Sequence, residues 1–188
     1  MKRIAIFASG SGSNAENIHN RIDNSKVEII GFLSNNKKAK VLERAKRLQI
    51  NSAIFSKTEF LDKSFLEHPL LKEVDLIVLA GFLWKVPKYL ITTFPNKIVN
   101  IHPALLPKYG GKGMYGMNVH NAVVENKEIE TGITIHYVNE NYDEGAVIFQ
   151  VTTPVKEKDT PEDVVAKIHE LEFEYFPKII EKVLFENE

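Results

Sequence analysis

Short apolar runs alternate with amphipathic stretches along the first hundred residues. The runs are rich in β-branched residues and lack regular polar positions, so they predict strands that are buried on both faces. They lie at 4–8, 27–33, 75–79 and 98–101, with a shorter run at 53–55. Helical periodicity fills the segments 14–22, 37–48 and 58–71, the last with Thr58 as its expected N-cap. Such alternation predicts right-handed βαβ units in a doubly wound sheet.

The pattern changes in the second half of the chain. A helix is expected at 118–125, and period-two alternation then predicts strands at 131–138 and 147–155. The short polar segment between these strands, 139–145, predicts that they form an antiparallel pair.

A long helix is expected at the C-terminal end. It should begin at Thr160, because a threonine N-cap, a proline at the first helical position and two acids follow one another there. It should extend to Leu184, and Pro177 should kink or divide it. The expected fold class is therefore α/β: a Rossmann-like, mostly parallel twisted sheet with helices on both faces, an antiparallel strand pair and a long C-terminal helix. No repeat, linker or low-complexity tract divides residues 1–188, so one domain is expected.

Composition narrows the class of protein. The chain has 188 residues and a formal net charge of −1, with Lys and Arg scattered rather than clustered. Nucleic-acid binding depends on cations that neutralise phosphates, so this balance argues against a nucleic-acid partner. The absence of cysteine excludes disulfides and thiolate metal sites. The first apolar run is too short for a signal peptide and the longest, 76–84, is too short to span a bilayer, so a cytoplasmic protein is expected.

Three places could carry chemistry, and the first is the loop "ASGSGSNA" at residues 8–15. Gly10, Gly12 and Ala15 satisfy the G-x-G-x-x-G/A pattern, in which glycines and a helix N-terminus receive a phosphate. A dinucleotide site would also need an acid at the end of the second strand, and residues 32–37 contain none. A phosphate or phosphoribosyl group is favoured over NAD, and the alternative is a tight turn without a ligand.

The second place is the stretch "NIHPALLPKYGGKGMYG". Asn100 and His102 lie where a strand ends, and residues two apart in extended backbone point the same way. An amide N–H beside an imidazolium could stabilise a developing oxyanion. The alternative is a pair that satisfies the backbone of a proline-rich turn. Pro107 could follow a cis peptide bond, and the glycines of 110–116 could form a mobile flap over a ligand.

The third place is Asp143, in the loop between the two antiparallel strands. A carboxylate close to His102 would raise the pKa of that imidazole and keep it protonated. The alternative is a solvated acid. His120 and His136 are interpreted as structural, because histidines on helices and strands commonly satisfy local hydrogen bonds.

Five motifs in fixed order resemble one enzyme family over nearly the whole chain. The motifs are "GSGSN", "LAGFLWKVP", "NIHPALLPKYGGKGMYG", "TGITIHYVNENYDEGAVI" and "EFEYFPKII". Together they are similar to the glycinamide ribonucleotide formyltransferases, folate-dependent transferases of purine synthesis. The resemblance implies that a formyl group passes from 10-formyltetrahydrofolate, a co-substrate, to the amine of glycinamide ribonucleotide without a metal. It also implies a phosphate-binding half at 1–100 and a catalytic, folate-binding half at 101–188.

The resemblance assigns roles to residues of this sequence. Asn100, His102 and Asp143 match the family's catalytic set. The ribonucleotide-binding positions are Gly12, Ser13, Asn14 and Glu172, with the loop on the phosphate and the glutamate on the ribose. The folate-binding positions are Lys57, Leu83, Trp84, Lys85 and Val86, together with Asn100 and Asp143. The implied partners are small molecules, with a monomer or homodimer as the assembly.

Other protein families share part of this sequence pattern and are alternative interpretations. Methionyl-tRNA formyltransferases share the "NIHP…LLP" element but are expected to need a further C-terminal domain and a basic RNA-binding face. Formyltetrahydrofolate hydrolases are expected to carry an additional N-terminal domain, and amino-sugar formyltransferases are a further alternative. From another class, the chain could be a nucleotide-binding regulatory module that uses only the loop 10–14.

Overall fold

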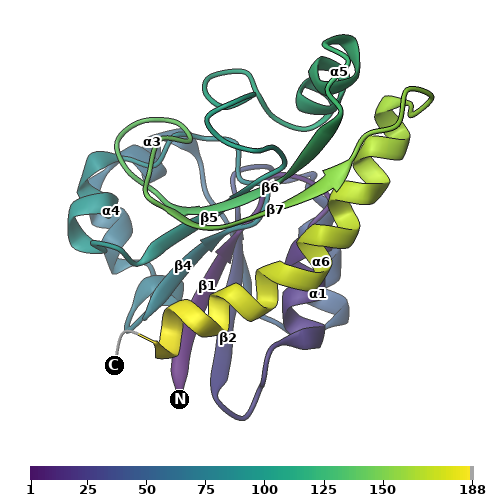
Figure 1. Cartoon of the computed structure of the whole chain (residues 1–188). Helices are drawn as coiled ribbons and strands as arrows, with labels where there is room; N and C mark the ends of the chain where they lie inside the picture. Colours follow the sequence, from purple (N-terminus) through teal and green to yellow (C-terminus); the bar gives the residue numbers. More distant parts are fainter. Residues whose placement is uncertain (187–188) are drawn as a thin grey trace.

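One seven-stranded sheet forms the centre of the computed structural model, which describes residues 1–186 (Figure 1). The strands are β1 (Lys2–Phe7), β2 (Val27–Ser34), β3 (Ser52–Ile54), β4 (Leu76–Leu79), β5 (Ile98–His102), β6 (Glu130–Tyr137) and β7 (Val147–Pro154). They lie in the order β3-β2-β1-β4-β5-β6-β7. The first five are parallel, whereas β6 and β7 are antiparallel to their neighbours. The predicted fold class is confirmed.

Helices cover both faces of this sheet. They are α1 (Ser13–Arg21), α2 (Lys40–Arg47), α3 (Lys57–Leu61), α4 (Lys88–Thr93), α5 (Met117–Glu125) and α6 (Pro161–Phe185), with 3₁₀ turns η1 (Lys63–Glu67) and η2 (Pro69–Leu71). Successive residues of β1 enter opposite cores: Ile4 and Ile6 pack with α1, α2 and α6, whereas Ala5 and Phe7 pack with α3, η1 and α4. Because both faces are buried, the strands are continuous apolar runs rather than alternating ones.

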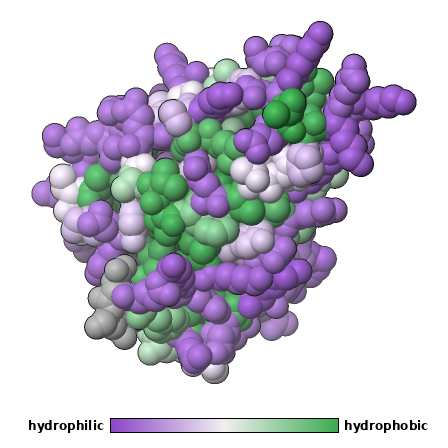
Figure 2. All heavy atoms as spheres, viewed as in Figure 1, coloured by the Kyte–Doolittle hydropathy of each residue, from purple (hydrophilic) through white to green (hydrophobic). Residues whose placement is uncertain are grey.

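The outer surface is mainly polar. Figure 2 shows charged and polar residues around the rim of one face and apolar residues exposed in its middle. Within residues 1–186, no helix combines the length and the apolar character needed to cross a bilayer.

Several predicted helix boundaries are wrong, for local reasons. The helix expected at 58–71 is broken into α3, η1 and η2, since the Asp62 side chain accepts from Ser64 N–H and starts a new turn. The N-cap of α3 is Ser56 in a capping box with Glu59, and Thr58 lies inside the helix. The helix expected at 37–48 begins at Lys40, and α4 was not predicted.

Pro177 does not divide the C-terminal helix, which is assigned as one element from Pro161 to Phe185. A proline removes the N–H that would bond to the carbonyl four residues earlier, here that of Phe173. Nδ2 of Asn17, on α1, donates a 2.9 Å hydrogen bond to this carbonyl. The neighbouring helix therefore replaces the missing donor, and of the two expected outcomes, a kink or a division, the division does not occur.

Candidate functional site

A cavity of about 460 Å³ opens at the carboxyl ends of β1, β4 and β5. Here the sheet order reverses, since β2 lies on one side of β1 and β4 on the other. Open α/β sheets bind ligands at such a point. The cavity is lined by segments 9–14, 80–83, 100–103, 111–116 and 142–143 and by residues of α5 and α6.

The glycine loop after β1 forms one wall. Gly12 is the N-cap of α1 in the left-handed conformation, with φ of 71°, and no side chain caps the helix. A Cβ there would lie 2.5 Å from Cγ2 of Val41, so only glycine fits between the loop and α2. Gly12 therefore offers no side-chain acceptor to the first-turn N–H groups of α1, and the Ser13 N–H has only a long contact of 3.5 Å to Ser11 Oγ, an arrangement that suits an anion. The structure brings Gly12, Ser13 and Asn14 together on this wall.

A hydrogen-bonded link joins this loop to the segment after β4. Ser9 N–H donates to the Gly81 carbonyl at 3.0 Å, and Ser9 Oγ accepts from Leu83 N–H at 3.0 Å. Ser9 is buried and was not among the predicted site residues. It sets the position of Leu83, the one predicted folate residue of the 83–86 segment that lines the cavity.

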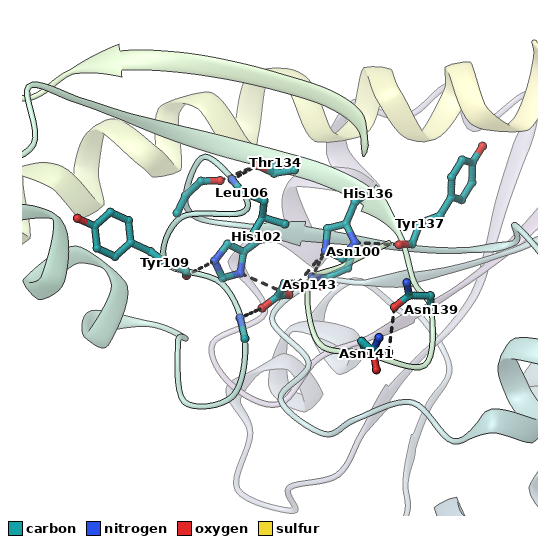
Figure 3. A network of polar contacts seen from close by, with 12 residues as sticks. Asn100, His102, Leu106, Tyr109, Thr134, His136, Tyr137, Asn139, Asn141 and Asp143 are labelled. Atoms are coloured by element: carbon teal, nitrogen blue, oxygen red, sulfur yellow. Dashed lines mark hydrogen bonds and ion pairs between the residues drawn. The ribbon is translucent and has the colours of Figure 1, made fainter. Parts of the chain in front are cut away.

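Asn100, His102 and Asp143 meet at the opposite wall (Figure 3). Asn100 and His102 project from the same face of β5, as expected for residues two apart. Nδ1 of His102 lies 3.6 Å from Oδ1 of Asp143, which arrives on the loop between β6 and β7. The three predicted catalytic residues are thus neighbours in space, although the third is far along the sequence.

His102 is held between two acceptors. Its Nε2–H donates to the Tyr109 carbonyl at 2.7 Å, and its Nδ1 faces the Asp143 carboxylate. Both neighbours favour the protonated ring, but burial disfavours charge and lowers the pKa of His102 below its ordinary value. The expected attraction by Asp143 is present, yet the predicted net rise in the pKa is wrong because desolvation outweighs it.

Asp143 is fixed by its backbone as well as by its partners. It has φ of 56°, in the left-handed region, and its Oδ2 accepts a 2.8 Å hydrogen bond from Gly111 N–H. Burial alone raises the pKa of Asp143; His136, when its Nε2 carries a hydrogen, the charge of a protonated His102 and the Gly111 N–H lower it below the usual value. The carboxylate is therefore ionised at neutral pH and ties the glycine-rich segment to the site.

Asn14 and Glu172 form a second polar pair in the cavity. Nδ2 of Asn14 donates to Oε2 of Glu172 at 2.9 Å, and both side chains are buried. Burial raises the pKa of Glu172 to about 7, against a smaller lowering by Asn14. Oδ1 of Asn14 and Nδ1 of His120 are buried without a hydrogen-bond partner. A buried polar atom without a partner is costly, so this end of the cavity suits a ligand rich in hydroxyl groups.

The remaining predicted folate positions do not line the cavity. Trp84 and Val86 pack into the aromatic cluster on the far face of the sheet, where the Trp84 ring lies 6.0 Å from that of Phe55. Lys57 is the first residue of α3, and both it and Lys85 are exposed to solvent. The structure does not bring these four residues together with the catalytic set.

The glycine-rich segment expected as a flap borders the cavity. Gly111, Gly113 and Gly116 all have positive φ. Leu106 and Pro107 are joined by a cis peptide bond, which the sequence allows. Within residues 1–186, no three His, Cys, Asp or Glu side chains are grouped as metal ligands would be.

His120 and His136 were interpreted as structural, but each contacts the site. His120 lines the cavity from α5, and burial lowers its pKa to about 4. His136 stands opposite Asn100 in the β5–β6 ladder and bonds to it. Only the pairing of β6 with β5 could have revealed this contact, and the sequence pattern predicts the pairing of β6 with β7 alone.

The strand order, the glycine loop after β1 and the cavity at the switch point define a Rossmann-like protein with a cavity of the kind that binds small ligands. The family model described as "Formyl transferase" matches residues 2–180. The chain therefore belongs to the formyl transferase family, and its relatives include several phosphoribosylglycinamide formyltransferases. Membership of this family implies that the formyl donor is derived from folate.

The named relatives cover nearly the whole chain. Phosphoribosylglycinamide formyltransferase of Bacillus subtilis is 35% identical over 98% of this chain and 95% of its own length. The chloroplastic enzyme of Arabidopsis thaliana is 37% identical over 95% of this chain, which spans only 64% of that relative. Among solved structures, the enzyme of Anaplasma phagocytophilum has a TM-score of 0.87 at 30% identity, covering 97% of this chain and 86% of that one.

Proposed function

We propose that this protein transfers the formyl group of 10-formyltetrahydrofolate to the amino group of glycinamide ribonucleotide. The products are N-formylglycinamide ribonucleotide and tetrahydrofolate, and the reaction is a step of de novo purine synthesis. The observation that carries the proposal is that one cavity holds both a loop suited to phosphate and the Asn100–His102–Asp143 set. The names of the relatives support the same activity.

The chemistry follows from the groups in the cavity. The substrate amine attacks the formyl carbon, a C–N bond forms, and the bond from that carbon to folate N10 breaks. The tetrahedral oxyanion between these steps needs N–H donors, which Asn100 and His102 would supply; the negative charge of the oxyanion, with that of Asp143, would favour the protonated His102 ring against the lowering effect of burial. Asp143 favours the protonated state of His102 and would pass the proton of the attacking amine, through water, to the leaving nitrogen.

The ribonucleotide would lie along the wall formed by α1 and α6. The loop containing Gly12, Ser13 and Asn14 would receive the phosphate, and Glu172 would bind the ribose hydroxyls. The raised pKa of Glu172 makes its carboxyl either donor or acceptor near neutral pH, which suits a diol. A vicinal diol would also supply donors to the unpartnered Oδ1 of Asn14.

The folate would enter over the segment after β4. Leu83 lines the cavity and would contact the pterin directly, whereas Trp84 and Val86 would contribute through their backbone because their side chains are packed in the core. Lys57 and Lys85 are exposed and would act only on a part of the donor that extends outside the cavity. In this proposal residues 1–188 work as one domain, since the cavity draws on both halves.

A direct assay tests the function. Purified protein, 10-formyltetrahydrofolate and glycinamide ribonucleotide should give N-formylglycinamide ribonucleotide, detected by mass spectrometry, with equimolar tetrahydrofolate. A parallel reaction without ribonucleotide measures transfer to water, which would indicate a hydrolase. If folded protein consumes no formyl donor in response to the ribonucleotide, the proposal is wrong.

A further inference from the structure

We propose that His136 is a positioning residue that fixes the amide of Asn100 for catalysis. The inference rests on the proposed formyl transfer and adds a residue that does not itself touch the substrate. His136 and Asn100 are direct partners across the β5–β6 ladder, so their side chains lie on the same face of the sheet (Figure 3). Nδ2 of Asn100 lies 3.0 Å from Nε2 of His136.

The neighbouring carbonyl determines which nitrogen of His136 carries the proton. Nδ1 of His136 lies 2.8 Å from the Tyr137 carbonyl, which can only accept. Nδ1 therefore carries the hydrogen, and in the neutral ring Nε2 is left with a lone pair. That lone pair accepts from Asn100, whose Nδ2 can only donate. In the series of hydrogen bonds from Asn100 through His136 to Tyr137, each atom can therefore act only as a donor or only as an acceptor.

The carbonyl that sets this tautomer is itself held in place. Tyr137 N–H donates to the Ala146 carbonyl at 2.9 Å, and a Cβ at position 145 would lie 1.7 Å from the Tyr137 oxygen. Glycine at 145 therefore lets the returning loop close against Tyr137. With only 2% of its surface exposed, His136 has no route to exchange these partners for solvent.

The orientation of the Asn100 amide matters because one of its two terminal atoms accepts hydrogen bonds and the other donates them. Rotation by half a turn about its last torsion exchanges an acceptor oxygen for a donor nitrogen at nearly the same place. Asn100 lines the cavity, and the proposed oxyanion needs the donor. With one N–H committed to His136, the second N–H and Oδ1 are held at set positions in the cavity.

Asp143 offers His136 a competing arrangement. Its Oδ1 lies 3.7 Å from Nε2 of His136, beyond hydrogen-bond distance, whereas Asn100 lies at 3.0 Å. A doubly protonated His136 would pair with this carboxylate and would repel the Asn100 N–H. The proposal therefore requires a neutral His136 with its proton on Nδ1.

Nitrogen NMR of the ¹⁵N-histidine-labelled full chain tests the tautomer without any substrate. The His136 resonances, assigned by their loss in the His136→Gln variant, should show a protonated Nδ1 and a bare Nε2. Protonation of Nε2, alone or with Nδ1, would overturn the proposal. Because this readout does not depend on turnover, it decides the tautomer even if the proposed formyl transfer fails.

Kinetics of two His136 variants test the consequence. His136→Phe keeps a flat ring but removes the acceptor, and kcat should fall by about tenfold to a hundredfold, less than the loss expected for a whole oxyanion donor. KM for both substrates should change by less than about threefold, because ground-state binding is not altered. His136→Gln restores an acceptor oxygen and should recover most of kcat. Equal losses in both variants, or a loss confined to KM, would contradict positioning.

A double-mutant cycle with Asn100→Ala separates positioning from a general structural effect. If His136 acts through Asn100, then His136→Phe should cost less than about twofold in kcat when Asn100 is already alanine. Fully additive losses would overturn the proposal. An inactive wild-type protein would instead refute the formyl transfer itself, and thermal unfolding of each variant identifies any that fail to fold.

Discussion

Nδ2 of Asn14 donates a 2.9 Å hydrogen bond to Oε2 of Glu172, joining α1 to α6 across 158 positions of the sequence. The bond brings the phosphate-type loop and the C-terminal helix to the same cavity. It also places a carboxyl group where burial keeps it protonated up to a pH of about 7.

Glu172→Gln should remove a pH dependence of stability. The folded pKa of about 7 exceeds the unfolded value near 4.3, so the native state holds a proton that the unfolded state has lost between these values. Wild-type stability should therefore fall as pH rises from about 4 to about 7, by about 3 kcal/mol. The variant should lack this fall and should bind the ribonucleotide about tenfold more weakly.

Urea unfolding between pH 4 and pH 8 measures this difference. Glu174→Gln is the matched control, because Glu174 is exposed on the same helix. It should reproduce the wild-type profile. A Glu172→Gln profile parallel to that of the wild type would show that Glu172 ionises normally.

Asp143→Asn should lower the pKa of His102 further. The carboxylate is the strongest influence that opposes desolvation there, so its removal leaves burial dominant. Turnover should fall by about a hundredfold to ten-thousandfold, the usual contribution of general acid–base catalysis. NMR titration of His102 checks the pKa, and Glu144→Gln, at an exposed neighbouring position, is the control. An unchanged His102 titration would mean that the 3.6 Å contact is not maintained in solution.

Asp143 should also contribute to acid stability. Its folded pKa is lowered, so the stabilisation is fully present above the unfolded value of about 3.9 and is lost as pH falls through the folded pKa. Wild-type stability should therefore fall more steeply on acidification through this range than that of Asp143→Asn, which lacks the contribution of the carboxylate at every pH. Identical acid profiles would contradict the assignment.

Gly12→Ala should destabilise the loop and weaken ribonucleotide binding. The new Cβ would lie 2.5 Å from Val41 and would occupy a residue with φ of 71°. Strain of this kind costs about 1–3 kcal/mol. Gly10→Ala is the stability control, because no atom lies within 4 Å of its Cβ position. Thermal unfolding and ribonucleotide titration compare them, and equal stability of the two variants would argue against the close approach of α2.

Asn17→Ala should destabilise the protein by about 1–3 kcal/mol, because the Phe173 carbonyl would lose its donor. In a Pro177→Ala background, the restored helical N–H should supply that donor, so Asn17→Ala should cost less. Chemical denaturation of the four proteins in this cycle measures the coupling. A cost that is the same in both backgrounds would mean that Asn17 does not compensate for the proline.

Much of the fold could be predicted, because its determinants are local. The runs near β1, β2, β4 and β5 are mostly apolar because both faces of the sheet are covered, and the sequence alone reveals that pattern. Helix boundaries were less accurate. The side chain of Asp62 accepts one hydrogen bond and so begins a new 3₁₀ turn. The periodicity of apolar residues does not reveal such a contact.

The site residues likewise fall into two groups: those that local sequence patterns reveal and those that depend on contacts between distant segments. The glycine loop and the Asn100–His102 spacing are short-range patterns, and family order linked them to Asp143 and Glu172. The sequence by itself therefore determined most of the strands and the residues of the glycine loop and the Asn100–His102 pair, but not the pairing of β6 with β5 or the place of Ser9 in the cavity. Only the tertiary structure decided their states: Glu172 is protonated near neutrality because α1 and α6 bury it, and burial lowers the pKa of His102 despite Asp143. His136 meets Asn100 through strand pairing, and Asn17 meets Phe173 through helix packing, since desolvation and hydrogen-bond partners depend on contacts between segments far apart in the chain.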